Sequence, residues 1–336
     1  MSLSSRPRHR CRSLGLHNPL KPNQIKSFVT FGDSYTTSST KATAPTLKPG
    51  RLHPHYSLPF AKSGATCSNN LTFRPFPPVF ESQLPSYFEF HATDAGEKVG
   101  GRDTVYTLWI GTNDLGVSAL LTGDDPGVTV VDVAECMVNW VKVLYEQGGA
   151  RNFVFQNLEQ CFLMPGSDLQ RYTQMIPLQH TILYAADSYP NRFWFTDRNT
   201  TAWSVQMTEQ VEAGNELTKL MLQNLAPTLD DAHVGSDVSS LAYFDSHSLF
   251  QDMFDHPENF LNGTAPAFNV TGCINSCVFE LNVPDSGVCT VVNGTDRDSY
   301  LWFDELHPSE QADRIVAREI AKVFEGKESQ WATWLS

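Results

Sequence analysis

Residues 27–34 read Ser-Phe-Val-Thr-Phe-Gly-Asp-Ser, a short apolar run that ends abruptly at Gly32. A run of this kind, bounded by a turn residue, is typical of a buried strand. A second apolar run at residues 104–110 ends in the same way, just before Asn113. Because the carboxyl ends of neighbouring parallel strands meet at one edge of a sheet, we expect Ser34 and Asn113 to lie on the same rim.

Apolar residues recur with a regular spacing over most of the chain. Helices are predicted where the spacing is three to four residues, and strands where short apolar runs end in turn residues. The helices are expected at residues 79–88, 130–147, 168–186, 203–225, 246–254 and 308–326, the strands at 27–31, 104–110, 152–155, 193–195 and 241–244, and a loop at 36–60. Strands that alternate with helices indicate an α/β protein, here a three-layer α/β/α sandwich with a mostly parallel central sheet.

The chain has 336 residues, enough for one large α/β domain, which we expect at residues 25–328. Within it, residues 255–298 are rich in Asn, Gly, Pro and Cys and have few periodic apolar positions. We expect this part to be an ordered surface excursion held by disulfides. Residues 1–24 are polar and lack the apolar segment of a secretory signal peptide, so we interpret them as a disordered tail or a wrongly assigned start.

Overall charge and hydropathy argue against two classes of partner. The net charge is −13, which argues against nucleic acid, because phosphate backbones bind basic surfaces. No stretch approaches the roughly 18 consecutive apolar residues that a membrane span needs. We expect a monomer, although the sequence leaves the oligomeric state open.

Cysteines and glycosylation motifs indicate the secretory pathway. Sequons act as acceptors only in that compartment, where disulfides also form. The sequons lie at Asn70, Asn199, Asn262, Asn269 and Asn293. The cysteines of the expected domain, whose pairing is left open, are Cys67, Cys136, Cys161, Cys273, Cys277 and Cys289. We therefore expect a secreted glycoprotein with disulfide bonds.

The sequence Asp-Glu-Leu-His-Pro at residues 304–308 directly precedes the last predicted helix. A serine hydroxyl is a weak nucleophile until a base takes its proton. His307 is a candidate base, and Asp304, three residues before it, could orient its imidazole. Ser34, His307 and Asp304 are thus candidates for nucleophile, base and orienting acid. Taken singly, the Gly-Asp-Ser segment also fits an ordinary turn, and the histidine also fits a helix cap.

Two further residues are candidates for holding a negatively charged oxygen beside Ser34. Asn113 offers a side-chain N–H₂ donor, and Gly64 and Ser34 offer backbone N–H groups. A single donor of this kind contributes roughly 3–4 kcal/mol in a comparable enzyme. Asn113 and Gly64 are each also common turn residues, so neither is decisive alone.

Cys273, Cys277 and Cys289 supply part of a zinc-binding pattern, but no clear fourth ligand accompanies them. We interpret these thiols as one disulfide plus a link elsewhere, so no metal site is expected.

The order and spacing of the segments FVTFGDSY, SGATCSNN, WIGTNDLG and DELHPSEQA resemble the GDSL, or SGNH, hydrolase superfamily from about residue 27 to 325. The resemblance assigns the superfamily's serine, glycine, asparagine and histidine to Ser34, Gly64, Asn113 and His307, and its aspartate to Asp304. It implies a flavodoxin-like fold and a serine esterase that works through an acyl-enzyme without metal or cofactor. Within the superfamily, the segments are most similar to the fungal carbohydrate esterases of family 16, secreted acetylesterases that act on acetylated sugars. Members of this type are expected to carry a signal peptide, which residues 1–24 do not show.

The resemblance predicts hydrolysis of short acyl esters, with acetylated oligosaccharides or other small esters as substrates. A GDSL-type lipase or phospholipase is the alternative enzyme; it predicts an apolar acyl groove, and no amphipathic lid is visible in the sequence. A catalytically silent carbohydrate-binding protein on the same fold is a third hypothesis, disfavoured because all five superfamily positions are occupied.

Overall fold

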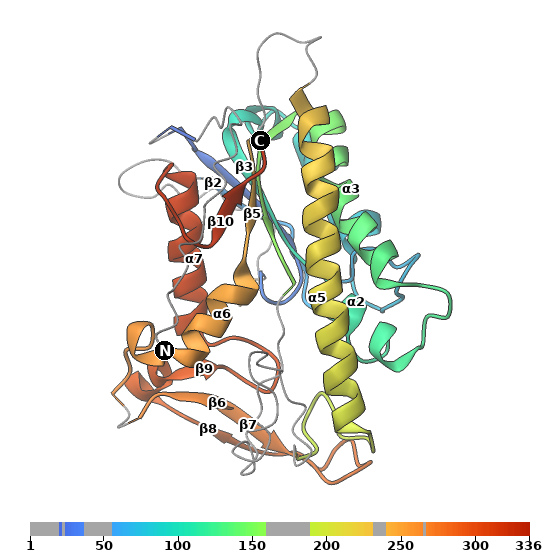
Figure 1. Cartoon of the computed structure of the whole chain (residues 1–336), viewed down its shortest axis with the longest axis vertical. Helices are drawn as coiled ribbons and strands as arrows, with labels where there is room; N and C mark the ends of the chain where they lie inside the picture. The colour runs from blue at the N-terminus through green and yellow to red at the C-terminus, as the bar shows by residue number, and fades with distance from the viewer. Residues whose placement is uncertain (1–19, 22–23, 37–55, 159–188, 231–239, 265–266) are drawn as a thin grey trace, which may run out of the picture.

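The computed structural model describes residues 20–21, 24–36, 56–158, 189–230, 240–264 and 267–336. Its centre is a six-stranded sheet with the order β10-β5-β4-β3-β1-β2 (Figure 1). The strands are β1 (Ser27–Gly32), β2 (Tyr56–Pro59), β3 (Gly101–Trp109), β4 (Ala150–Gln156), β5 (Ser240–Phe244) and β10 (Ala332–Trp334). All neighbouring strands run parallel except β10 against β5. The sequence-based prediction of a mostly parallel central sheet is confirmed.

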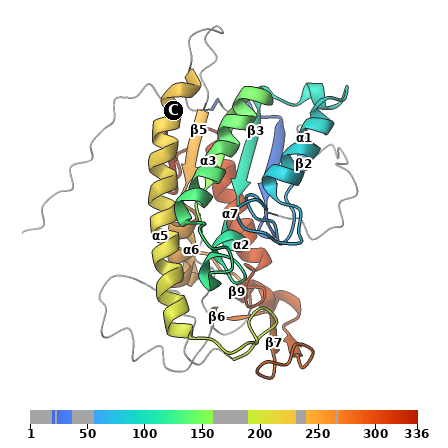
Figure 2. The same ribbon diagram turned by 90° about the vertical axis from the view of Figure 1, so that its right-hand side faces the viewer.

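Helices cover both faces of the sheet, as Figures 1 and 2 show from two sides. One face packs against α1 (Leu84–His91), α3 (Val130–Gln147) and α5 (Thr200–Leu225), and the other against α6 (Ser246–Asp255) and α7 (Glu310–Phe324). Strand β3 shows why two layers form. Its Tyr106 and Leu108 lie in the α3 core, whereas Val105 and Trp109 lie in the α7 core, since successive strand residues point to opposite faces.

Local sequence accounts for where the long helices begin. Helix α3 starts at a reciprocal capping box in which the Thr129 side chain accepts from the Asp132 N–H and the Asp132 carboxylate accepts from the Thr129 N–H. Helix α7 starts at Glu310, two residues later than predicted from Pro308, because the hydroxyl of Ser309 accepts from the Ala312 N–H and caps the helix there.

Two predictions of local structure were wrong. Residues 36–60 were expected to be loop, but Tyr56–Pro59 forms β2, which pairs in parallel with β1 at the edge of the sheet. A strand of four residues carries too little apolar pattern to stand out in a loop-like composition. The aromatic run 193–195 was expected to be a strand but belongs to none, because it packs as a turn in which the N–H and C=O of Asn191 and Trp194 pair with each other. The helix predicted at 168–186 lies outside the described residues.

Short elements complete the described chain. A π-helical turn (Val79–Gln83) leads into α1, and α2 (Thr112–Leu115) follows β3. Short 3₁₀ turns lie at Gly96–Lys98, Leu120–Thr122, Ala226–Asp230, Pro257–Asn259 and Gly294–Ser299. No helix in the described residues is both long and apolar enough to cross a membrane.

The segment after α6 contains two small sheets. β6 (Asn269–Cys273) pairs with β9 (Tyr300–Trp302), and β7 (Asn275–Val278) forms a hairpin with β8 (Val288–Val291). A disulfide joins Cys277 to Cys289 across this hairpin, and a second joins Cys67 to Cys136 on α3. The prediction of a further link from this group of cysteines was wrong, because Cys273 is a free, buried thiol. The expected presence of disulfides is confirmed, and two pairings are now assigned.

The two disulfides should contribute unequally to stability. They close loops of different length, with sequence separations of 69 for Cys67–Cys136 and 12 for Cys277–Cys289. In the chain-entropy description, these contribute about 4 and about 3 kcal/mol respectively. We expect C67S/C136S to lower the free energy of unfolding more than C277S/C289S, as measured by urea denaturation. The reverse order would mean that packing around the hairpin, not loop closure, governs the contribution.

Candidate active site

Ser34 lies in a turn that directly follows β1. Gly32 ends the strand at φ +141°, a conformation that favours glycine, and a Cβ there would lie 2.1 Å from the carbonyl oxygen of Trp109. The side chain of Gln83 pairs with both backbone groups of Gly32, accepting from its N–H at 3.0 Å and donating to its C=O at 2.8 Å. Asp33 donates its N–H to the Trp109 C=O at 3.2 Å. The turn is therefore held from both sides, and Ser34 remains only partly buried.

His307 reaches Ser34 from the loop between β9 and α7. The distance from its Nε2 to the Ser34 Oγ is 2.9 Å, and its Nδ1 lies 2.9 and 3.1 Å from the two carboxylate oxygens of Asp304. A carboxylate only accepts, so the Nδ1 carries the proton and the Nε2 is free to accept from the serine hydroxyl. Ser34 and His307 are more than 270 positions apart in the chain. The structure nevertheless brings them together with Asp304, as the sequence predicted.

The loop itself is fixed by hydrogen bonds. The Asp304 carboxylate also accepts from the backbone N–H groups of Leu306, at 2.9 Å, and His307, at 2.8 Å. The Tyr35 hydroxyl donates to the Leu306 C=O at 3.0 Å, which ties the serine turn to the histidine loop. Burial acts to raise the pKa of Asp304, but the hydrogen bonds and charge of His307 outweigh it and hold the pKa below its ordinary value. Asp304 is therefore ionised beside the imidazole.

Asn113 lies in α2, just after β3, and its amide is held at both ends. The Nδ2 donates to the Ala65 C=O at 2.9 Å, and the Oδ1 accepts from Arg74 at 3.3 Å. Gly64, directly before Ala65, has a φ of +77°, and the ring of Phe76 lies so close that a Cβ on Gly64 would be 2.6 Å from it. The segment around Gly64 and the amide of Asn113 are thus in direct contact.

The next carboxylate, Asp114, anchors this contact. It accepts from the Cys67 N–H at 2.9 and 3.1 Å and from the Thr72 hydroxyl at 2.9 Å. Burial nevertheless raises the pKa of Asp114 to about 6. Its role is structural: it joins α2 to the segment that carries Gly64.

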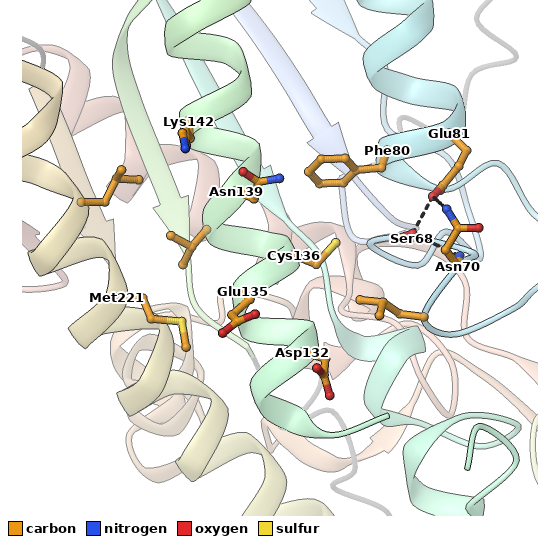
Figure 3. A pocket seen from close by; sticks show the side chains of 13 residues that line it. Ser68, Asn70, Phe80, Glu81, Asp132, Glu135, Cys136, Asn139, Lys142 and Met221 are labelled. Atoms are coloured by element: carbon orange, nitrogen blue, oxygen red, sulfur yellow. Dashed lines mark hydrogen bonds between the residues drawn. The ribbon is translucent and has the colours of Figure 1, made fainter. Parts of the chain in front are cut away.

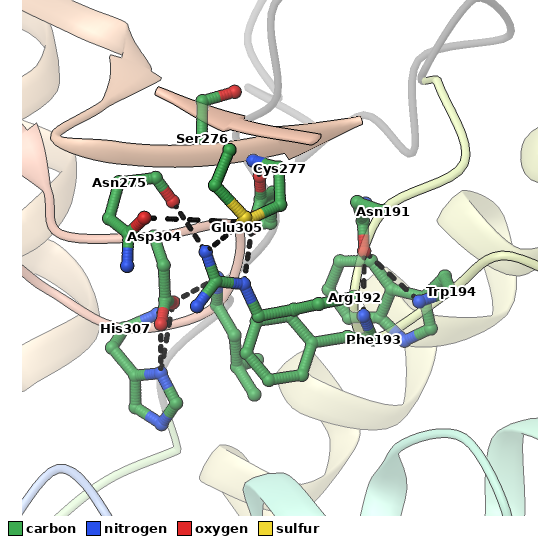
Figure 4. A network of polar contacts seen from close by, with 12 residues as sticks. Asn191, Arg192, Phe193, Trp194, Asn275, Ser276, Cys277, Asp304, Glu305 and His307 are labelled. Atoms are coloured by element: carbon green, nitrogen blue, oxygen red, sulfur yellow. Dashed lines mark hydrogen bonds and ion pairs between the residues drawn. A yellow bond between two sulfur atoms is a disulfide. The ribbon is translucent and has the colours of Figure 1, made fainter. Parts of the chain in front are cut away.

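A group of polar residues that no sequence pattern indicated lies behind His307 (Figure 4). Glu305, fully buried at its side chain, forms an ion pair with the Arg192 Nε at 3.2 Å and accepts from the Cys277 N–H at 2.5 Å. Phe193, next to Arg192, places its ring edge-on to the His307 ring with a centroid distance of 5.7 Å. The disulfide hairpin and the segment 189–195 are thereby attached to the loop that carries His307. Only the position of Glu305, between Asp304 and His307, offered a signal in the sequence.

A groove of about 670 Å³ lies elsewhere, between α3, α5 and the segment 68–81 (Figure 3). Two of its carboxylates are engaged locally: Glu81 accepts from Ser68 and Asn70, and Asp132 caps α3. Neither Ser34 nor His307 lines it, so it is separate from the serine and histidine pair. Among the described residues, no group of three or more His, Cys, Asp or Glu side chains could hold a metal ion.

The five sequon asparagines all lie in the described residues. Four are exposed, and Asn269 is half-buried. Two of them also shape the backbone: the Asn199 side chain caps α5 by accepting from the Ala202 N–H, and Asn269 accepts from the N–H groups of Thr271 and Gly272. In both residues the side-chain oxygen accepts these hydrogen bonds, so they do not involve the amide nitrogen to which a glycan would be attached. Their use as glycosylation sites stays a prediction.

Comparison with known proteins gives the chain its family. Residues 28–320 match the family described as GDSL-like Lipase/Acylhydrolase. The chain belongs to this family. The GDSL match spans both the Ser34 turn and the His307 loop, and it makes the protein a carboxylic ester hydrolase.

Two curated relatives share this chemistry by name. An acetylesterase of Hypocrea jecorina is 27% identical over 359 aligned residues, covering 94% of this chain and 93% of that protein. The GDSL esterase/lipase At1g29670 of Arabidopsis thaliana is 28% identical over 116 residues, 33% of this chain and 28% of its own length. Among solved structures, an acetylxylan esterase of Geobacillus stearothermophilus has a TM-score of 0.41 at 11% identity, covering 93% of this chain and 100% of that one.

The buried carboxyl of Asp33 should make stability depend on pH. Burial raises its pKa from 3.8 to about 7, so the folded protein binds this proton more tightly than the unfolded chain. The stabilisation is complete below about pH 4 and is lost as the pH rises through about 7. We expect Asp33→Asn, which cannot ionise, to gain about 3 kcal/mol of unfolding free energy relative to the parent between pH 5 and pH 8.

Urea denaturation of both proteins at the two pH values measures this gain. Asp94→Asn, a change at an exposed carboxyl, is the matched control. A parent-to-variant difference that is the same at both pH values would show that Asp33 is ionised throughout the range.

Proposed function

We propose that this GDSL hydrolase is a serine esterase that removes short acyl groups, acetyl foremost, from carbohydrates. The observation that carries the proposal is the continuous relay from the Ser34 hydroxyl through His307 to Asp304, with distances of 2.9 Å at both steps. This geometry is the one that activates a serine for attack on an ester carbonyl.

The first half-reaction transfers the acyl group to Ser34. The Oγ attacks the carbonyl carbon while the His307 Nε2 takes the hydroxyl proton, and Asp304 stabilises the imidazolium that forms. The Asn113 Nδ2 and the backbone N–H groups of Ser34 and Gly64 hold the oxyanion. When the tetrahedral intermediate collapses, the ester bond breaks and His307 donates its proton to the leaving sugar hydroxyl.

The second half-reaction releases the acid. Water takes the place of the alcohol, His307 removes a proton from it, and the hydroxide adds to the acyl-enzyme carbonyl. The second tetrahedral intermediate collapses with return of the proton to the Ser34 Oγ. Every proton moves through one imidazole, so no step requires a metal or a cofactor.

Bulky rings support a small acyl group. Phe76 covers Gly64, and Phe193 stands edge-on to His307, so an aromatic ring borders the proposed oxyanion donor and the proposed base alike. Rings in these positions limit the space beside the acyl carbon. Phe76 also keeps 45% of its surface exposed, as suits a side chain that contacts the sugar of an incoming substrate.

A named relative supports the acetyl preference, and the sequence resemblance supports the carbohydrate substrate. The protein of Hypocrea jecorina that aligns along 94% of the chain is named an acetylesterase, in agreement with the resemblance to the carbohydrate esterases of family 16. The two disulfides and the four exposed sequon asparagines support an extracellular protein.

One observation favours a second candidate, a lipase that acts on long acyl chains. The β7–β8 hairpin and its tip expose Val278, Leu281, Val283, Val288 and Val291. The hairpin is attached to the catalytic loop through the contact between Cys277 and Glu305. An apolar surface beside the site is what a lipid interface would require.

Substitution of the nucleophile tests the mechanism. We expect Ser34→Ala to lower kcat by at least about 10³-fold with the fold intact, because the attacking oxygen is removed and only binding remains. The measurement is hydrolysis of p-nitrophenyl esters from acetate to palmitate, with circular dichroism of both proteins as the check on folding.

The chain-length series separates the candidates. Activity that is greatest on acetate and collapses with length supports the acetylesterase, and acetylated xylo-oligosaccharides are then the next substrates. A preference for palmitate supports the lipase. Near-normal turnover in Ser34→Ala would contradict the nucleophile assignment. Absence of hydrolysis by the parent protein would favour a carbohydrate-binding role. Loss of activity with a chelator would indicate a metal.

The pH profile tests the roles of His307 and Asp304. We expect kcat/KM to fall on the acid side, because a charged imidazole cannot accept the serine proton. Asp304→Asn removes the negative charge that stabilises the imidazolium, so it should lower kcat and also move the acid limb to lower pH. An acid limb that stays in place in this variant would assign the limb to another group.

A further inference from the structure

Arg74 is built into the back of the proposed oxyanion site. Its Nη1 donates to the Asn113 Oδ1 at 3.3 Å, and its Nη2 donates to the Val117 C=O. Its backbone is clamped by Asn69, whose Oδ1 accepts from the Arg74 N–H at 3.2 Å and whose Nδ2 donates to the Arg74 C=O at 2.9 Å. Hydrogen bonds to both the backbone and the side chain of Arg74 therefore fix the position of its guanidinium.

The surroundings of this guanidinium are acidic. Asp114 and Asp33, both fully buried, and Asp125 all interact with its charge. Burial lowers the pKa of Arg74, and these carboxylates oppose that effect. A half-buried arginine with such partners keeps a fixed direction, unlike a solvated surface side chain.

The contact with Arg74 determines which way the Asn113 amide faces. An amide has one accepting oxygen and two donating hydrogens. With the oxygen engaged by the guanidinium, the nitrogen faces Ala65, donates one hydrogen to its C=O, and retains a second hydrogen for an oxyanion. The flipped amide would set its N–H₂ against the guanidinium and its oxygen against the Ala65 carbonyl, so both contacts would become repulsive.

We propose that Arg74 is a positioning residue of the oxyanion site, which fixes the Asn113 amide with its N–H₂ toward the reacting carbonyl and polarises that amide by donating to its oxygen. The inference rests on the proposed function, because it assigns to Asn113 the role of oxyanion donor. A charge-assisted hydrogen bond to the amide oxygen draws electron density from the nitrogen and makes its N–H a stronger donor.

A double-mutant cycle on p-nitrophenyl acetate tests the coupling. Removal of one oxyanion donor costs about 10²- to 10³-fold in kcat, so we expect Arg74→Met, which leaves the donor but frees it to turn, to lower kcat by about tenfold or more. KM should change by less than about twofold, because the interaction strengthens only in the transition state. In an Asn113→Ala background, the same change should alter kcat by less than about twofold.

Arg151→Met is the matched control. Arg151 is also part-buried and also donates to two backbone carbonyls, those of Tyr145 and Ala150, but it lies at the opposite end of the sheet, at the start of β4. It should leave kcat unchanged. An equal loss from Arg74→Met with and without Asn113 would overturn the proposal, as would an unchanged kcat in Arg74→Met. Ser34→Ala gives the lowest kcat expected without the proposed nucleophile. If this variant turns over normally, the proposed esterase mechanism is wrong, independently of the result of the double-mutant cycle.

If the kcat of Asn113→Ala is as low as that of Ser34→Ala, the double-mutant cycle cannot be measured. A measurement that does not depend on turnover then tests the proposal. In protein labelled with ¹⁵N-asparagine, the side-chain signals of Asn113 are identified by their loss in Asn113→Ala. Arg74→Met should shift or broaden this pair, and Arg151→Met should not. Unchanged Asn113 signals in Arg74→Met would contradict the positioning role.

Discussion

The close pairing of β1 with β3 is the constraint on which the candidate site depends. In this parallel pair, Gly32 faces Trp109 in register, and the Trp109 carbonyl oxygen lies only 2.1 Å from where a Cβ of residue 32 would be. Both strands therefore end at the same level, and the chains leave the sheet side by side toward Ser34 and Asn113. β1 is also the point at which the strand order reverses, with β2 on one side and β3 on the other. Sites in α/β sheets form at such points because the connections diverge there and leave a crevice.

The other half of the relay is delivered by a different layer of the molecule. His307 lies on the loop that leads into α7, which packs on the face of the sheet opposite α3. Two buried carboxylates hold this loop through different partners. Asp304 accepts from the N–H groups of Leu306 and His307 within the loop, and Glu305 connects the loop to Arg192 and the β7 hairpin. The position of the His307 imidazole therefore depends on α7, which packs on the sheet, and on the β7 hairpin, which contacts Glu305.

The sequence predicted what short patterns encode and missed what depends on distant partners. The sheet, the long helices and the placement of Ser34 and Asn113 followed from periodicity and turn residues. β2 was missed because an edge strand of four residues gives almost no periodic signal. Gln83, Arg74 and Glu305 were missed because nothing about a polar residue in a helix or loop tells which buried partner it will meet. Phe193 was misassigned because aromatic residues suit a strand and a site wall equally well.

The three buried carboxylates near Ser34 differ in how well each could serve the proposed base, His307. Asp33 is fully buried, and its pKa is raised to about 7 by desolvation, so at neutral pH it is only partly ionised. Asp114 accepts three hydrogen bonds, but its pKa is still raised to about 6, and its contacts all serve the backbone and Thr72. Asp304 alone of the three combines two backbone donors with an imidazole N–H, and its pKa is lowered. A permanent negative charge is what the developing imidazolium needs, and the hydrogen-bond donors around each carboxylate, not burial alone, decide which one can supply it.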